Sequence, residues 1–271
     1  MLNKIDKIML GVLPALFALS LGLHWPEGKS AVEPELPESV VIEQAEEPPV
    51  VTIPDFGSMV DVKAKKSAFF NFLLPMVQQE NDVILQSRRR IIALSLQSAL
   101  SEKDQSWLAD MGRKYRIQDV SAFDKMFFEA LLSCVDMIPA SLALAQSANE
   151  TAWGTSRFAR QGNNFFGQWC FTPGCGIVPG ARPEGETYEV QKFKDVAASV
   201  RAYMHNLNTN HQYKAMRQLR EQRRIRQEPF TGADLAHGLQ AYSIRGTEYI
   251  EELLSMINSN KLQQYDLHGQ G

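Results

Sequence analysis

The sequence lacks the residue patterns of several common enzyme classes. Its five histidines are scattered, and none forms the paired spacing by which zinc amidases hold their metal. It contains no glycine-rich phosphate-binding loop and no internal repeat. The net charge of -3 and the pI near 6.0 leave no basic excess for nucleic acid binding. We therefore expect no metal, no cofactor and no nucleic acid partner.

Cysteine is also scarce, and its three copies divide into a pair and a single residue. Cys170 and Cys175 bracket a segment that contains the turn signal Pro-Gly. A turn between two strands brings such residues within bridging distance, so in an exported protein we expect a disulfide. Cys134 lies in an apolar helical segment and is expected to be buried and inert. Paired cysteines in a turn argue against a cysteine–histidine peptidase.

A long apolar run occurs only at the N-terminus, where two lysines precede the segment from Ile8 to Leu23. Residues 1–26 are therefore expected to be a signal peptide or a single membrane anchor. Residues 27–60 are rich in Glu, Pro and Val and are expected to form a disordered linker. The protein is thus expected to be exported to the periplasm, with anchoring to the inner membrane as an open alternative.

The rest of the chain favours a mainly α fold. With 271 residues and 44% hydrophobic content, the chain can bury a sizeable core. In residues 61–135, apolar side chains recur at helical spacing, which predicts an N-terminal helical region that packs against a catalytic domain in residues 136–265. The basic run from Arg217 to Arg226 is expected to be a solvated helix face.

The most informative segment is an Ala-rich helix that ends at a carboxylate. Pro139 suits the first turn of this helix and Gly154 suits its end, which places Glu150 in or just past the last turn. The carbonyl end of a helix disfavours negative charge, and a neighbouring apolar group such as Trp153 adds desolvation. Both effects raise the pKa of Glu150, as a general acid requires. The alternative is an ordinary solvated Glu that ends a helix.

Residues 169–193 are expected to form a small β-hairpin lobe, because short β-rich runs alternate with Pro-Gly and Gly-containing turns. The lobe carries three carboxylates that are candidates for a second catalytic group, namely Glu184, Glu186 and Glu189. We favour Glu186, which would activate water or stabilise oxocarbenium charge. A solvated hairpin face and assistance by the N-acetyl group of the substrate remain alternatives.

Two motifs resemble the bacterial glucosaminidase domain, which has a lysozyme-like fold and cleaves peptidoglycan. They are the run Ser147–Ser156, which includes Asn-Glu-Thr-Ala-Trp-Gly, and Asn-Asn-Phe-Phe-Gly at 163–167. The Leu-Pro at residues 74–75 and the Cys…Cys hairpin resemble the Bax group within this family. The resemblance covers about residues 63–265. Tyr242 stands where the family has a Tyr that faces the active site, although Ile244 replaces the usual Thr.

The resemblance implies an endo-β-N-acetylglucosaminidase that cleaves a β-1,4 bond of peptidoglycan without a metal. Glu150 would be the general acid, assisted by Tyr242 and Glu186, while Trp153, Asn164 and Phe166 would shape the sugar subsites. We expect a monomer whose partner is the glycan strand. A lytic transglycosylase on the same glycan and a non-catalytic wall-binding module are the alternative functions.

Overall fold

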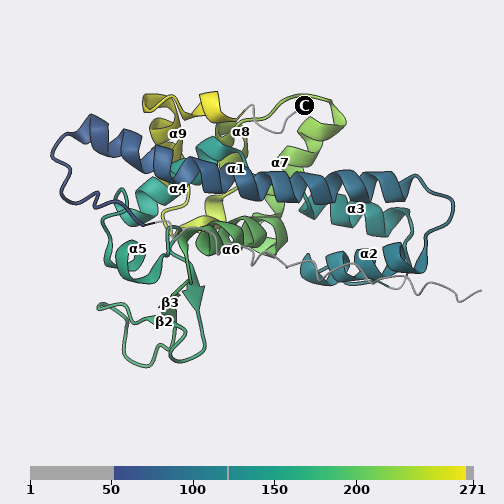
Figure 1. Ribbon diagram of the computed structural model, residues 1–271, viewed down its shortest axis with the longest axis horizontal. Helices are drawn as coiled ribbons and strands as arrows, with labels where there is room; N and C mark the ends of the chain where they lie inside the picture. The colour runs from purple at the N-terminus through teal and green to yellow at the C-terminus, as the bar shows by residue number, and fades with distance from the viewer. Residues whose placement is uncertain (1–51, 121, 267–271) are drawn as a thin grey trace, which may run out of the picture. The chain divides into compact units, whose positions relative to one another are not determined.

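The computed structural model describes residues 52–120 and 122–266, which form a mainly helical body with one small sheet (Figure 1). The α-helices of this part are α1 (Val62–Ser95), α2 (Glu102–Lys114), α3 (Lys125–Cys134), α4 (Ala140–Thr151), α5 (Arg157–Gly162), α6 (Val196–Thr209), α7 (Lys214–Ile225), α8 (Gly232–Ala236) and α9 (Thr247–Ser259). The expected mainly α fold with a small β lobe is thereby confirmed. The expected signal or anchor segment and most of the expected linker lie outside the described residues.

Helix α4 lies at the centre of the helical body. Nine consecutive residues of it, from Ala140 to Ala148, are buried, and α1, α8 and α9 all pack against it. Its Ala-rich sequence permits this, because small side chains let neighbouring helices approach closely while favouring the helix itself. The free N–H of Ser141 donates to the carboxylate of Asp266 at 2.8 Å, which places negative charge at the positive end of the helix.

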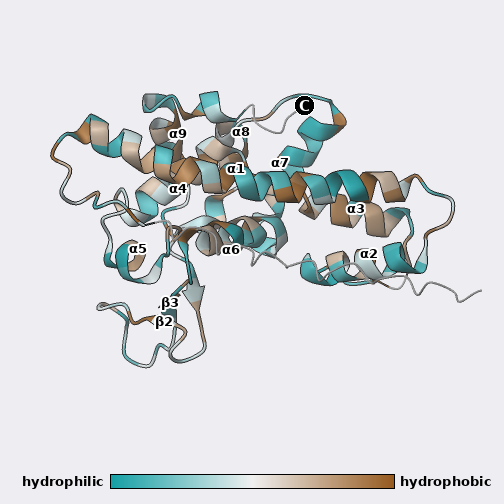
Figure 2. Ribbon diagram, viewed as in Figure 1, coloured by the Kyte–Doolittle hydropathy of each residue, from teal (hydrophilic) through white to brown (hydrophobic). Residues whose placement is uncertain are grey.

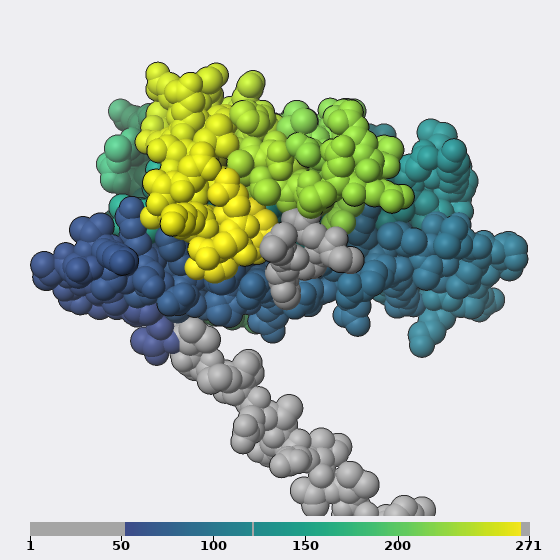
Figure 3. Space-filling model, turned by 90° about the horizontal axis from the view of Figure 1, so that it is seen from above, coloured from purple at the N-terminus to yellow at the C-terminus, as the bar shows by residue number. Residues whose placement is uncertain are grey.

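The long helix α1 runs through Pro75 and forms one side of this core. Phe69, Leu73 and Val77 are fully buried at intervals of four residues, so one stripe of the helix faces inward. Contacts with α4 and α6 join the region expected at residues 61–135 to the region that follows. The part of the chain near the C-terminus also lies against α1 (Figure 3). Asn260 and Tyr265 line a cavity there together with Lys63 and Phe70.

The packed region begins before α1. Phe56 is 1% exposed and its ring meets those of Phe69 and Phe72. A Cβ at Gly154 would lie 2.4 Å from the Phe56 ring, so this aromatic packs directly on the turn that follows α4. The ordered body therefore starts several residues before residue 60, where the sequence suggested that the linker ends.

The β lobe is a three-stranded antiparallel sheet of β1 (Trp169–Cys170), β2 (Gly176–Ile177) and β3 (Glu189–Gln191), in the order β1-β3-β2. Val190 of the central strand is registered opposite Trp169 on one side and Ile177 on the other. The expected hairpin is present, and the segment directly after the 163–167 loop adds a third strand to it.

The expectation of a solvated basic face on α7 is wrong for two of its arginines. Figure 2 shows α7 as mostly hydrophilic, yet Arg220 is 1% and Arg217 is 7% exposed. The Arg220 guanidinium donates to the carbonyl oxygens of Asp136 and Met137, and burial lowers its pKa to about 10, so it remains charged at neutral pH. Arg220 thereby satisfies buried carbonyl groups at the end of α3 and beyond it. Arg217 instead donates to the carbonyl oxygens of Leu207 and Asn210 at the end of α6.

Candidate active site

Glu150 lies in the last turn of α4, as the sequence predicts. The helix ends at Ala152, and three successive residues from Ala152 to Gly154 have positive φ angles of 48°, 62° and 77°. The backbone N–H of Trp153 returns to the carbonyl oxygen of Ala148 at 2.9 Å and closes the helix end. Positive φ at two non-glycine residues is costly, and such strain is concentrated at functional sites.

The carboxylate of Glu150 is open to solvent but closely surrounded by protein atoms. The hydroxyl of Tyr249 on α9 donates to its Oε1 at 3.1 Å. On the other side, a Cβ at Gly167 would lie 3.1 Å from its Oε2. Desolvation by these surroundings raises the pKa of Glu150, against the opposing effects of the Tyr249 hydrogen bond and the charge of Arg245. The predicted direction of the pKa shift is thus confirmed, and desolvation is its main cause.

A chain of buried hydrogen bonds fixes the Tyr249 hydroxyl. Tyr203 on α6 donates to Oε1 of Gln146 at 2.6 Å, and Nε2 of Gln146 donates to the Tyr249 oxygen at 3.0 Å. Gln146, Tyr203 and Tyr249 are each at most 1% exposed. Because the Tyr249 oxygen accepts from Gln146, its own proton is free to point at Glu150. The sequence did not single out Tyr249 as a site residue.

The Arg nearest to this network does not neutralise Glu150. Arg245 pairs with Glu252 at 2.6 Å, and Glu252 also accepts from the side chain of Asn149 at 3.1 Å. The negative charge of Glu252 adds a small upward contribution to the pKa of Glu150. The cation is therefore held by another carboxylate, and the acid is left without a buried ion pair.

Asn164 and Phe166 lie inside the protein. Asn164 is 1% exposed, its Nδ2 donates to the carbonyl oxygens of Gln168 and Gln191, and its Oδ1 accepts from the N–H groups of Phe166 and Gln168. The Phe166 ring is 1% exposed and stacks on Tyr203 at 3.9 Å. In this structure the two side chains hold the loop that brings Gly167 to Glu150.

Tyr242 lies close to the same network. Its hydroxyl donates to the carbonyl oxygen of Phe166 at 3.0 Å, and its ring stacks on Tyr249 at 5.6 Å with an interplanar angle of 5°. Burial raises the pKa of Tyr242, so its hydroxyl stays protonated at neutral pH. The structure therefore brings Tyr242 beside Tyr249 and the 163–167 loop, and its role in catalysis stays a prediction.

Trp153 packs on α1. Its ring meets Phe69 and Phe70 edge-on at 5.7 Å and 5.4 Å, and the ammonium group of Lys66 lies 4.8 Å from its centroid. The ring is half-buried there. These contacts anchor the strained turn after α4 to the helical body, and a stacking contact with sugar stays a prediction.

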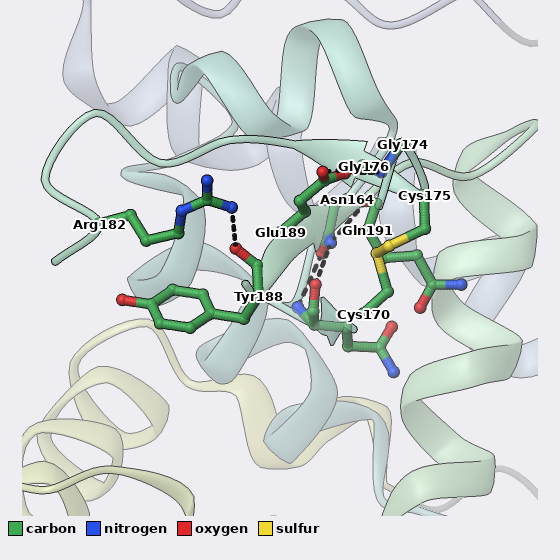
Figure 4. The surroundings of a disulfide bond; sticks show 10 residues. Asn164, Cys170, Gly174, Cys175, Gly176, Arg182, Tyr188, Glu189 and Gln191 are labelled. Atoms are coloured by element: carbon green, nitrogen blue, oxygen red, sulfur yellow. Dashed lines mark hydrogen bonds between the residues drawn. A yellow bond between two sulfur atoms is a disulfide. The ribbon is translucent and has the colours of Figure 1, made fainter. Parts of the chain in front are cut away.

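The hairpin carboxylates occupy different settings. Glu189 has a structural role, because its carboxylate accepts hydrogen bonds from the N–H groups of Gly174 and Gly176 at 3.0 Å and 2.7 Å (Figure 4). These two hydrogen bonds lower the pKa of Glu189. Glu184 and Glu186 lie exposed in the turns before β3. Glu184 and Glu186 therefore both remain candidates for the second group, and Glu186 is still the one that we favour.

The expected disulfide joins Cys170 to Cys175, across the turn that Glu189 supports (Figure 4). Both sulfur atoms lie near the Glu189 carboxylate, but a bridged sulfur is no thiolate and cannot serve as a zinc ligand. Cys134 is half-buried, and burial raises the pKa of its thiol, in keeping with an unreactive side chain.

Among the described helices, none is long and apolar enough to cross a membrane.

Comparisons with known proteins found a matching family and a similar protein. Residues 128–262 match the family described as mannosyl-glycoprotein endo-beta-N-acetylglucosaminidase. The chain is 30% identical over 210 residues to Protein bax of Escherichia coli (strain K12), an alignment that covers 78% of this chain and 75% of that protein. No solved structure matches the chain. The family match runs from α3 to the segment after α9, so it contains Glu150, the β lobe and Tyr249.

Proposed function

This chain belongs to the glucosaminidase family as a Bax-like member, and on that premise we propose that it cleaves a β-1,4 glycosidic bond of peptidoglycan as an endo-β-N-acetylglucosaminidase. One observation carries the proposal. Glu150 presents a solvent-accessible carboxyl group whose pKa is raised by desolvation, at the end of a buried helix. A carboxyl group with a raised pKa is suited to donate the proton that glycoside cleavage requires.

In this mechanism Glu150 donates its proton to the oxygen of the bond that breaks. The leaving sugar departs as a neutral alcohol, while positive charge develops on the anomeric carbon. The Tyr249 hydroxyl occupies Oε1, which leaves Oε2, on the side of Gly167, to carry the proton. Water then adds to the anomeric carbon and gives up a proton, which returns to the Glu150 carboxylate, so the acid is regenerated.

The positive charge requires a second group. Glu186 is our candidate, because it is exposed on the β lobe while Glu189 is held by the disulfide turn. The acetamido oxygen of the substrate is the alternative, since substrate-assisted glycosidases need only the acid. The two routes differ in the effect of Glu186→Gln, which stops the first and spares the second.

The proposed setting follows from the substrate. Peptidoglycan lies outside the cytoplasm, so we propose that residues 1–26 direct export to the periplasm as a signal peptide or remain as an inner-membrane anchor. Residues 27–51 would then carry the enzyme to the wall. The chain would act as a monomer on glycan strands, without nucleic acid or cofactor.

The test is digestion of purified peptidoglycan by the full chain, with mass spectrometry of the released fragments. Reducing N-acetylglucosamine ends support the proposal, and Glu150→Gln should abolish them while wall binding persists. Anhydromuramyl ends would identify a lytic transglycosylase instead. Wall binding without any cleavage would identify a non-catalytic binding module.

A further inference from the structure

The β lobe carries a pair of stacked aromatic rings that the reaction described above does not use. Trp169 on β1 and Tyr188, just before β3, stack at 4.3 Å with an interplanar angle of 8°. Trp169 is nevertheless 54% exposed. Since Tyr188 covers one face of the indole, the exposed area lies on its other face and its edges.

The strand register shows which side of the lobe these rings occupy. Successive side chains of a strand point to opposite faces, so Tyr188 and Val190 share one face and Glu189 occupies the other. Trp169 is registered opposite Val190 and stands on the same face. Figure 4 shows the Tyr188 ring leaving the strand on the side away from Glu189 and the disulfide.

This face is turned toward the helical body. Ile177 is also paired with Val190, and its Cδ1 would lie 3.2 Å from a Cβ at Gly162 on α5. Glu189 and the disulfide turn lie on the opposite face, where the carboxylate binds two glycine N–H groups. The stacked rings therefore extend from the side of the lobe that faces the helices.

The stacked rings also follow closely, along the chain, the loop that approaches Glu150. Gly167, whose Cβ position lies 3.1 Å from the acid, precedes Trp169 by two residues. Two extended residues span about 7 Å, a distance that one short oligosaccharide can bridge. An exposed aromatic ring two residues after the glycine that approaches the acid is suited to a sugar ring, whose apolar C–H face packs on a π surface.

We propose that the Trp169–Tyr188 pair is a stacking platform for an N-acetylhexosamine unit of the glycan strand, next to the unit whose bond is cleaved. The proposal rests on the proposed function, since it concerns the substrate of the same site. It assigns Trp169 to direct contact and Tyr188 to support of the indole from behind. The interior positions of Asn164 and Phe166 leave this role to exposed aromatic residues.

The test measures binding separately from cleavage. The full chain with Glu150→Gln is titrated with a β-1,4-linked hexamer of N-acetylglucosamine by calorimetry, alone and combined with Trp169→Ala. We expect Trp169→Ala to weaken binding about tenfold, within the range of one aromatic stacking contact, and Trp169→Phe to restore most of it. Phe171→Ala is the matched control, because Phe171 is 70% exposed on the same lobe without a stacked partner ring.

Each outcome of this titration either supports or overturns the proposed platform. Unchanged binding in Trp169→Ala, or no binding by the Glu150→Gln chain, overturns the platform. Equal losses in Trp169→Ala and Phe171→Ala overturn it too, since they indicate a general apolar surface. The proposal is also overturned if Trp169→Ala weakens binding to anionic phospholipid vesicles while the hexamer does not bind. A chain that binds the hexamer through Trp169 but releases no glycan fragments refutes the proposed function and keeps the platform.

Discussion

The hydroxyl of Tyr249 donates a hydrogen bond of 3.1 Å to Oε1 of Glu150, although 99 residues separate them in the sequence. The bond joins α9 to the end of α4, and Gln146 fixes its direction by donating to the same Tyr oxygen. It therefore selects one carboxyl oxygen as acceptor and leaves the other to carry a proton. We expect this contact to position the acid for catalysis.

Tyr249→Phe should lower kcat about tenfold and shift the pH profile upward, because a hydrogen bond to a charged group contributes roughly 1.5–3 kcal/mol. The Tyr249 hydroxyl lowers the pKa of Glu150, so its removal raises that pKa further. The alkaline limb of kcat/KM, measured on solubilised glycan strands, should therefore move to higher pH. An unchanged alkaline limb would contradict a direct effect on the acid.

Glu150→Gln should preserve folding and make stability less sensitive to pH. The folded pKa of Glu150 is raised above its ordinary value of 4.5, so the wild-type side chain contributes most stability when protonated, below that value. This contribution is lost as the pH rises through the folded pKa. The Tm of the variant relative to wild type should consequently increase between pH 4 and pH 7, as followed by circular dichroism. A relative Tm that falls over this range would show that the acid is stabilised as a carboxylate.

The sequence was sufficient for those features that depend on local patterns. An Ala-rich run that ends before Trp-Gly identified the helix that carries Glu150, and the Pro-Gly turn identified the Cys170–Cys175 bridge. Motif resemblance singled out the Asn-Asn-Phe-Phe-Gly loop, and the structure brings Gly167 of this loop close to Glu150. It did not show that Asn164 and Phe166 face inward, because a motif is equally well explained by ligand binding and by loop packing.

Features that depend on contacts between elements far apart in the chain could not be predicted from the sequence. Tyr249 reaches Glu150 only because α9 packs on α4, and no local signal encodes that contact. The buried Arg220 looked like part of a solvated run, since arginine is almost never fully buried unless paired. Asp136, an acidic residue within the apolar segment after α3, was the signal for a buried partner.

Asn164→Ala should destabilise the protein by about 3 kcal/mol or more, since it removes hydrogen bonds to several buried backbone groups and each unsatisfied group costs roughly 1–3 kcal/mol. Activity should fall as well, because the loop no longer holds Gly167 against Glu150. Urea denaturation gives the stability change. If the variant kept wild-type stability and only KM rose, Asn164 would bind substrate directly, as the motif resemblance suggested.

Asp136→Asn should be strongly destabilising at neutral pH. Asp136 is 2% exposed and forms ion pairs with Arg88, Arg220 and Arg224. Burial alone raises its pKa, but the three positive charges outweigh burial and hold the pKa below its ordinary value of 3.8. Breaking a buried network of this kind costs about 3–5 kcal/mol.

The depressed pKa also sets the pH dependence of that loss. The stabilisation by Asp136 is complete above its unfolded pKa and is lost as the pH falls through the lower folded value. The difference in unfolding free energy between wild type and Asp136→Asn should therefore shrink in acid below the ordinary pKa. A difference that stays constant down to strongly acidic pH would contradict the charge network.

Gly167→Ala tests the close approach of the loop to the acid. Gly167 has a φ of 64°, and a Cβ there would lie 3.1 Å from Oε2 of Glu150. The substitution should lower the free energy of unfolding by about 1 kcal/mol through backbone strain. It should also displace the oxygen that carries the proton, so kcat should fall even under conditions where the variant is fully folded. Gly174→Ala is the matched control, because Gly174 has a φ of 82° but nothing lies within 4 Å of its Cβ position. The control should lose similar stability and keep its activity. Equal losses of kcat in both variants would mean that strain, and not contact with Glu150, lowers the rate.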